Sequence, residues 1–278
     1  MIPRSVAASA SSALAAFCLA FAMLALVPRV AATAIPELKG YASLTRDQLL
    51  EALSGVQHGV RPELTAKNLS NLDLSGIDFR GANLSASILN GAKLMRAKLD
   101  GCNLTVSFLE GADLTGASLR DATLFSTQLA GGNLSHADLT GARLIADLRR
   151  TDLSGARLTR MNAAADMRNQ SMGLMHTVMV NARAIGADFS DSDFSRSELS
   201  FSDMTRAKLV RTKLYRADLS GTTLAGADLT GADLRDAVLI DVNFSGANLT
   251  NANLTGAQFR GVLGLDTAIK SNTLGLPE

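Results

Sequence analysis

Residues 112–121 read Ala-Asp-Leu-Thr-Gly-Ala-Ser-Leu-Arg-Asp, and this five-residue pattern decides the fold. Every fifth residue from Leu69 to Leu144 is Leu or Phe, and the same phase returns from Phe189 to Phe259 with a single exception. A period of five matches neither the period of about 3.6 of a helix nor the alternation of a simple strand. The pattern therefore predicts a wound backbone that turns a corner every five residues.

Each five-residue unit places a small residue, an Asp or Asn, a Leu or Phe, a Ser or Thr and often a Gly in that order. We call the second residue of this unit the outward position, the Leu or Phe the inward position and the last residue the corner position. A narrow coil needs one large and one small apolar side chain on each side, because all sides face the same axis. Gly suits a sharp corner, where a positive φ costs this residue least. Each buried Leu or Phe is expected to stabilise the coil by about 1.5 to 3 kcal/mol.

Units such as residues 112–116 and 232–236 resemble those of the pentapeptide-repeat family, and the resemblance extends over residues 67–261. It implies an all-β solenoid, a right-handed quadrilateral β-helix in which four five-residue units make one 20-residue coil. The chain has room for about ten such coils, and a spacing of about 4.8 Å between coils predicts a rod of about 45 to 50 Å. Residues 67–144 and 189–261 are the regular parts of this predicted solenoid.

The charged residues support a 20-residue coil independently of the family. If residues 20 apart stack, Asp193, Lys213 and Asp233 form a ladder of alternating charge. Exposed pairs of this type contribute only about 0.2 to 1 kcal/mol each, so the alternation indicates register more than stability. It also weakens a nucleic-acid interpretation of the nearby basic residues, since several of them stack against acids. These basic residues are Arg206, Lys208, Arg211, Lys213 and Arg216.

The residues on either side of the repeats are predicted to complete the stack. Within residues 35–66, the sequence Thr45-Arg46-Asp47-Gln48 reads as a capping box, and Gly55 as a stop signal, for a short amphipathic helix. Such a helix would cover the N-terminal coil, because a solenoid needs polar terminal caps for solubility. Residues 262–278 predict either a C-terminal cap or a contact in an end-to-end homodimer. The sequence is therefore compatible with a monomer and with a dimer. The apolar residues there that leave the five-residue phase are Val262, Leu263, Leu265 and Ile269.

Residues 1–34 have the composition of a signal peptide. They contain no acidic residue and are apolar through residues 13–27, and residues 32–34 (Ala-Thr-Ala) form a small-x-small cleavage pattern. The pattern predicts cleavage between Ala34 and Ile35 and a periplasmic or secreted protein. The alternative is a retained membrane anchor, because the apolar run is only slightly shorter than a spanning helix.

The five-residue phase is interrupted in residues 145–188. Leu148, Leu153 and Leu158 continue the period one residue early, and residues 161–175 have little repeat character. A slip of one residue requires a bulge or an extruded loop in a stacked coil. We therefore predict an irregular surface here, which is either a binding loop, as insertions in repeat proteins often are, or a bulged coil filled by Met side chains.

The same interruption contains candidate metal ligands. Met172, Met175, His176 and Met179 suggest a soft-metal site, because thioether and imidazole groups suit Cu(I). The spacing is not a recognised motif. Met179 also falls on the inward position, where Met204 shows that this chain uses Met for packing.

Composition limits the remaining function classes. The 27 Lys and Arg residues balance 26 Asp and Glu residues, which predicts no nucleic-acid partner. With three His residues and no nucleophile motif, we expect no enzyme and no cofactor. The family resemblance also suggests a role as a DNA mimic that modulates a topoisomerase. That role requires a strongly acidic surface, whereas the charges of this chain nearly balance. We therefore expect an exported structural or protein-interaction scaffold with an unknown protein partner and no membrane contact after removal of the leader. The alternatives are a topoisomerase-modulating DNA mimic and an envelope protein that binds a soft metal.

Overall fold

The computed structural model describes residues 40–57, 59–79, 81–165 and 176–277. Residues 40–278 form one compact unit, and the description below is confined to it. The predicted leader, residues 1–34 with the cleavage site between Ala34 and Ile35, lies outside the described residues. Within the described ranges, no helix is both long and apolar enough to cross a membrane.

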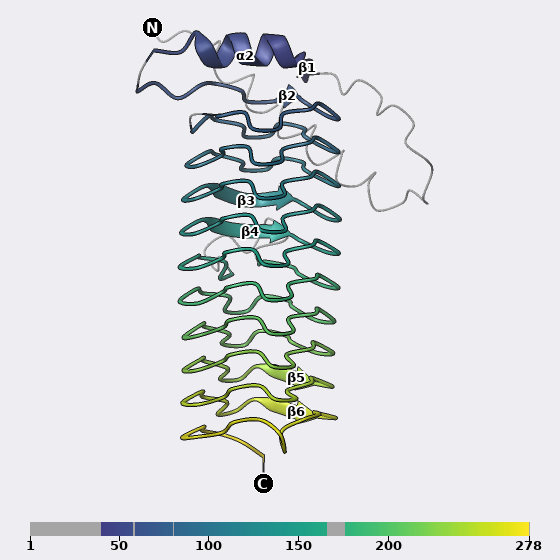
Figure 1. Ribbon diagram of the computed structural model, residues 1–278, viewed down its shortest axis with the longest axis vertical. Helices are drawn as coiled ribbons and strands as arrows, with labels where there is room; N and C mark the ends of the chain where they lie inside the picture. Colours follow the sequence, from purple (N-terminus) through teal and green to yellow (C-terminus); the bar gives the residue numbers. More distant parts are fainter. Residues whose placement is uncertain (1–39, 58, 80, 166–175, 278) are drawn as a thin grey trace, which may run out of the picture. The chain divides into compact units, whose positions relative to one another are not determined.

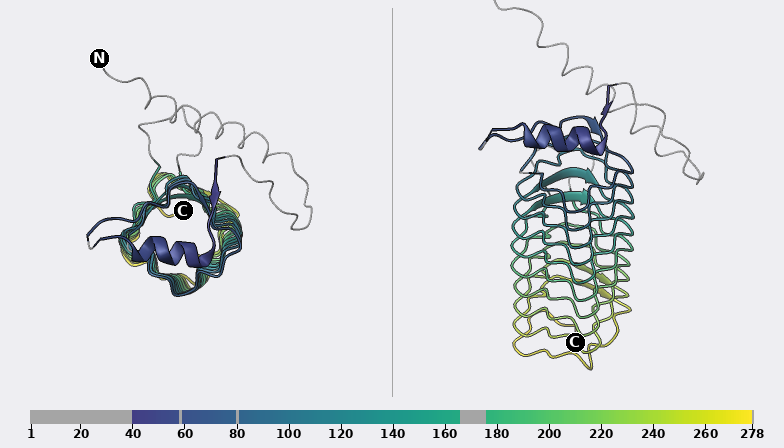
Figure 2. Two further views of the ribbon diagram at one scale, coloured as in Figure 1. Left: turned by 90° about the horizontal axis from the view of Figure 1, so that it is seen from above. Right: turned by 45° about the horizontal axis from the view of Figure 1, so that its top comes forward.

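The five-residue units wind into stacked coils (Figure 1), and a view along the stack shows a four-sided outline (Figure 2). Residues 20 apart are joined by parallel bridges: Asp73 to Lys93, Lys93 to Asp113, and so on along the unit. The ladder from Asp193 through Lys213 to Asp233 is among them. These bridges confirm the predicted 20-residue coil.

A β-turn forms the regular corners of the coil. The N–H of Ala92 donates to the carbonyl of Leu89 at 3.0 Å, and Gly91 between them has a φ of 64°. This left-handed conformation favours Gly, as the sequence predicts. Arginine also occupies it, for example Arg96 with a φ of 55°, so the corner conformation is imposed by the coil rather than by glycine alone.

Polar side chains in the repeat support the turns and the core wall. Asp113 Oδ1 accepts a hydrogen bond of 3.0 Å from the N–H of Thr115, and the same link recurs at other outward Asp and Asn residues. Buried Ser and Thr residues at the small position donate to a carbonyl of the previous coil, as Ser107 does to Leu84 at 2.7 Å. The hydroxyl groups are therefore buried with a partner.

The core is a column of inward Leu and Phe side chains with Ala or another small residue beside them. Leu114, Leu139 and Leu214 are fully buried, and Phe189 meets Phe194 edge to face with ring centroids 5.4 Å apart. Cys102 occupies a small position in this core, and burial raises the pKa of its thiol to about 12.

Regular strands are short because a corner interrupts the extended backbone every five residues. They form three parallel two-stranded pairs, in which each partner comes from the neighbouring coil. The pairs are β1 (Ala42–Ser43) with β2 (Lys67–Asn68), β3 (Thr123–Gln128) with β4 (Arg143–Asp147), and β5 (Val238–Ile240) with β6 (Gln258–Arg260).

Helix α2 (Arg46–Ser54) lies across the N-terminal end of the stack (Figures 1 and 2). Its capping box is confirmed, because the Gln48 N–H donates to Thr45 Oγ1 at 3.2 Å and the Thr45 N–H donates to Gln48 Oε1 at 2.9 Å. Leu49 and Leu53 are buried against the first coil. The helix therefore covers apolar side chains that would otherwise face solvent.

The one-residue slip of the repeat lies in the pairing of β3 with β4. Phe125 pairs with Ile145 in the regular register, whereas Thr127 pairs with Ala146 rather than with Asp147. Ser126 is therefore the extra residue in β3 and forms the bulge. Because of this bulge, the coil that contains β4 can be one residue shorter and still stack on the coil that contains β3.

Much of the segment 145–188, predicted to be interrupted, is wound into coils. Asp147 is bridged to Val178, and Asn162 to Asp193. Both spans exceed the regular spacing by the same amount, so a single insertion accounts for them. Because Asn162 is still bridged to Arg143 of the coil before, the extra residues fall between Asn162 and Val178. The irregular part of the predicted interruption is therefore confined to the residues between Asn162 and Val178.

The C-terminal residues form a further winding rather than a helix. Leu263, Ile269 and Leu274 are bridged to Asn243, Asn248 and Asn253 of the coil before. Their side chains are 61%, 55% and 57% exposed, respectively. Val262 and Leu265 instead pack partly against the core.

Candidate interaction surface

The candidate metal ligands do not form a described cluster. Met172 and Met175 lie outside the described residues. Met179 is fully buried at its inward position, and His176 Nε2 lies 3.9 Å from Glu198 Oε2 in a half-exposed pair. Among the residues that the structure describes, no group of three or more His, Cys, Asp or Glu side chains could hold a metal ion. The metal hypothesis therefore gains no support from the geometry.

An ion pair between a buried carboxylate, Asp147, and the exposed Arg149 lies at the edge of the interruption. Asp147 is only 3% exposed and receives hydrogen bonds from Arg149 Nε at 2.9 and 3.0 Å. Hydrogen bonding to Asp147 raises the pKa of Arg149, while burial and the nearby Asp147 charge raise the pKa of Glu110. Sequence reasoning missed this pair because Asp147 occupies the same outward position as the exposed Asp residues. Each charge has its counter-charge, so the pair is an internal contact and not an open site.

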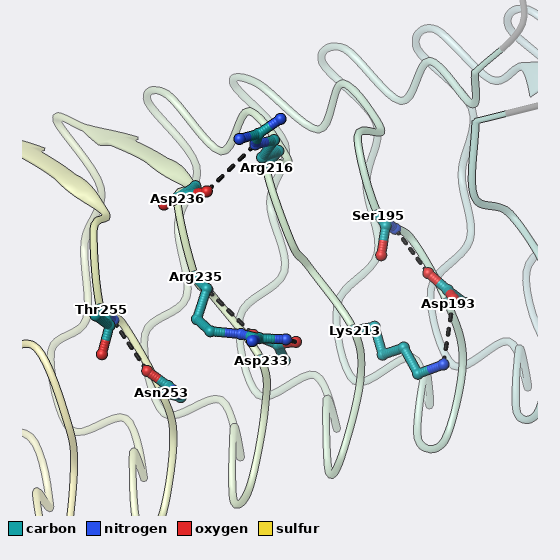
Figure 3. A network of polar contacts seen from close by, with 9 residues as sticks. All are labelled: Asp193, Ser195, Lys213, Arg216, Asp233, Arg235, Asp236, Asn253 and Thr255. Atoms are coloured by element: carbon teal, nitrogen blue, oxygen red, sulfur yellow. Dashed lines mark hydrogen bonds and ion pairs between the residues drawn. The ribbon is translucent and has the colours of Figure 1, made fainter. Parts of the chain in front are cut away.

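A polar network runs along one side of the stack between residues 193 and 255 (Figure 3). Asp193 accepts hydrogen bonds from the Ser195 N–H at 3.0 Å and from Lys213 Nζ at 3.4 Å. Farther along this side, Asp233 receives two bonds from Arg235, at 2.8 and 2.7 Å. These bonds from Arg235 lower the pKa of Asp233. The predicted ladder is therefore present in the backbone register, with a direct side-chain contact between Asp193 and Lys213, whereas Asp233 is bonded to Arg235 of its own coil.

An aromatic ring stands among the arginines of this side. The guanidinium carbons of Arg216, Arg235 and Arg196 lie 5.0, 5.7 and 5.8 Å from the centroid of the Tyr215 ring. We call these four residues the Tyr215 cluster. All three distances fall within the range of cation–π attraction. The same side carries a second pair of this kind, with Arg143 at 4.9 Å from the Phe125 centroid.

The three arginines of the Tyr215 cluster differ in their counter-charges. Arg235 is held by Asp233, and Arg216 Nε lies 3.2 Å from Asp236 Oδ2. Arg196 has no ion pair and no side-chain hydrogen bond to any residue that the structure describes. The coil therefore presents one uncompensated guanidinium beside a tyrosine.

Another basic residue in this part of the chain is neutralised at a corner. Arg211 forms a two-bond pair with Asp191, one coil before, at 2.6 and 2.7 Å. This contact lowers the pKa of Asp191. The ladders read from the sequence do not include this corner pair, although the 20-residue spacing could have found it. The pairing further reduces the free positive charge of the basic residues.

These features define a solenoid of stacked five-residue units whose outward side chains lie on flat sides. The family model described as "Pentapeptide repeats (8 copies)" matches the chain at residues 68–101, 93–127, 102–141, 174–209, 212–251 and 227–263. The chain belongs to the pentapeptide-repeat family.

Several solved structures are similar to this chain. HetL of the cyanobacterium Nostoc sp. strain PCC 7120, a pentapeptide-repeat protein involved in heterocyst differentiation regulation, is 27% identical, with 81% of this chain and 99% of that one covered and a TM-score of 0.39. Rfr23 of the cyanobacterium Cyanothece 51142 is 27% identical over 47% of this chain and 91% of its own, with a TM-score of 0.39. QnrB1, a plasmid-mediated fluoroquinolone resistance protein, is 18% identical over 73% and 91%, with a TM-score of 0.28. A search of curated proteins found no match.

Proposed function

We propose that this chain is an exported, non-catalytic scaffold whose flat sides bind a protein partner in the periplasm or outside the cell. In this proposal the leader is removed between Ala34 and Ile35, and the mature protein is a right-handed rod of about ten coils. The observation that supports this proposal is that the outward carboxylates and amides already form hydrogen bonds within the rod. They accept backbone hydrogen bonds in the turns, as Asp113 does, or pair with a neighbouring coil, as Asp193 does. Such groups are engaged in building the rod, which leaves the faces of the rod for contact with other proteins.

Export is tested by cell fractionation with N-terminal sequencing. The proposal expects periplasmic or secreted protein that begins at Ile35. Cytoplasmic protein that begins at Met1 would overturn it and favour the topoisomerase-modulating alternative. Protein that begins at Met1 in the membrane fraction would instead show that the leader is kept as an anchor.

Partner binding is tested by photo-crosslinking in the cells that make the protein. A benzophenone amino acid is placed on one side of the stack at a time, directly after an inward residue. We expect a discrete crosslinked product from at least one side, and no product from any side would contradict the scaffold proposal. The four positions are Val180, Ser195, Val210 and Ala225.

An end-to-end homodimer is a second part of the proposal. Leu263, Ile269 and Leu274 leave exposed apolar surface on the last described winding. We expect that Leu263→Glu combined with Leu274→Glu shifts sedimentation toward the monomer. Met95→Glu, at an exposed residue away from the ends, is the control. A wild-type protein that sediments as a monomer at every concentration would exclude the dimer.

A further inference from the structure

We propose that the Tyr215 cluster is the contact point for the protein partner and that it takes an acidic side chain, Asp or Glu, of that partner. The inference rests on the proposed scaffold function. It specifies the side of the stack that binds the partner and the kind of side chain that is bound. Three observations support it: Arg196 has no ion pair among the described residues, the Tyr215 hydroxyl group has no hydrogen bond to any of them, and acidic residues flank the cluster.

Arg196 is the source of the attraction. Its guanidinium carbon lies 5.8 Å from the centroid of the Tyr215 ring. Three nearby carboxylates are bonded to other basic residues: Asp193 to Lys213, Asp233 to Arg235, and Asp236 to Arg216 (Figure 3). Among the described residues, Arg196 is therefore the arginine of the cluster that has no acidic partner.

The Tyr215 ring adds a second donor and holds the site in shape. No described residue forms a hydrogen bond with the Tyr215 hydroxyl group, so this O–H can donate to a bound acceptor. Contact with an aromatic ring limits the motion of a guanidinium, which reduces the entropy lost on binding. A guanidinium and a carboxylate form charge-assisted, often paired, hydrogen bonds. Arg and Tyr are also the residues on which interface binding energy most often concentrates.

The flanking acids decide what kind of anion fits. Asp233 and Asp236 are bonded to Arg235 and Arg216 of the cluster (Figure 3), and Asp193 lies three residues before Arg196 in the same coil. A nucleic acid binds through several phosphates at once, so its backbone would run over these carboxylates and be repelled. One carboxylate on a side chain can reach the open guanidinium without crossing them. The charge pattern therefore fits a single acidic residue of a protein better than a polyanion.

Arg206 provides a matched control. Like Arg196 it is an exposed corner residue with positive φ, 55° against 61°, and it has no ion pair among the described residues. It differs in that no aromatic ring lies against it in the described part of the chain. Arg206→Gln removes the same charge as Arg196→Gln and leaves the Tyr215 cluster intact.

The test selects binders from displayed random 12-residue peptides with the purified full-length protein. One library contains all amino acids, and a second lacks Asp and Glu. We expect binders from the first library only, with Asp or Glu enriched among them. Arg196→Gln and Tyr215→Leu should reduce the recovery by about tenfold, the loss expected for one charge-assisted contact. Arg206→Gln should leave it unchanged, and circular dichroism should show that all variants are folded.

Several results would overturn the inference. They are equal recovery from both libraries, no recovery from either, or an equal effect of Arg196→Gln and Arg206→Gln. Preferential competition by a phosphopeptide or a DNA oligonucleotide over an acidic peptide would also overturn it. The crosslinking experiment separates this failure from that of the scaffold proposal. Products from Val180, Val210 or Ala225 but none from Ser195 would leave the scaffold in place and remove the Tyr215 cluster as its contact.

Discussion

Phe201 lies over the space that Gly221 leaves open on the next coil. A Cβ atom at Gly221 would stand 2.5 Å from Cδ1 of the Phe201 ring, although both residues are corners with positive φ. His136 and Gly155 repeat the arrangement, with 2.7 Å between His136 Nδ1 and the position of a Cβ. A corner glycine therefore has two roles here: it accepts the left-handed backbone, and it makes room for the side chain of the preceding coil.

Substitution of Gly221 by Ala should destabilise the coil through both roles. The left-handed backbone costs an L-residue about 1 to 2 kcal/mol, and a Phe201 ring displaced from its rotamer adds about 0.5 to 1.5 kcal/mol. The free energy of unfolding, measured by urea denaturation, should fall by the sum of the two.

Gly186→Ala separates the two roles. Gly186 has a similar φ of 64°, but a Cβ there would meet nothing within 4 Å, so this variant should lose only the backbone part. Phe201→Ala in the Gly221→Ala background should recover the difference. Equal destabilisation by both glycine variants would show that the Phe201 contact carries no energy.

The Cys102 thiol should be unreactive in the folded protein. The measurement is the rate of modification by a disulfide reagent in a Cys18→Ser chain, where Cys102 is the single cysteine. Burial raises its pKa from 9.0 to about 12, so the thiolate that reacts is scarce at pH 8 to 9 and has no access to solvent. We expect modification only after unfolding, and rapid modification of the native protein would contradict the core position of this residue.

The same pKa shift predicts a loss of stability at high pH. The folded state favours the protonated thiol, so this contribution is complete below the ordinary pKa of 9.0 and is lost as the pH rises toward 12. Cys102→Ala should flatten this part of the dependence. The unfolding free energy of both proteins, measured between these pH values, provides the comparison.

Asp191 should titrate below the ordinary Asp value of 3.8 because Arg211 hydrogen-bonds to its charged form. A lowered pKa means that the stabilising contact is present above the ordinary value and is lost as the pH falls through the folded value. Arg211→Gln should return the carboxyl pKa toward 3.8, as measured by carbon NMR of the Asp191 side chain. Arg206→Gln, on a different corner, should leave it unchanged.

Thr45→Ala should loosen the N-terminal end of the stack. Loss of this N-cap hydroxyl costs about 0.5 to 2 kcal/mol, and helix α2 covers the first coil with Leu49 and Leu53. Hydrogen exchange should therefore accelerate in α2 and in the first coil but not in the coils around Leu214. Uniform acceleration along the chain would indicate instead that the cap controls the whole stack.

Much of the architecture could be predicted from the sequence. The inward positions, the corner glycines, the 20-residue stacking and the capping box follow from patterns within a few residues or from one fixed spacing. The side-chain contacts of the interaction surface could not be predicted from the sequence in the same way. The outward Asp is buried at Asp147 and partly exposed at ladder positions such as Asp193, because burial depends on what covers a position and not on the repeat.

The sequence by itself determined the five-residue winding, since each unit carries its own turn and its own inward side chain, and the repeated spacing determined which coils stack. Tertiary structure alone decided where the slip is absorbed, at Ser126 in β3, and which side chains meet between coils. The physical reason is that the repeat specifies backbone positions, whereas contacts depend on rotamers and on the local coil length. Arg196 and Arg216 occupy the same corner position of the repeat, 20 residues apart. Only the structure shows that Arg216 is paired with Asp236, whereas Arg196 has no ion pair among the described residues.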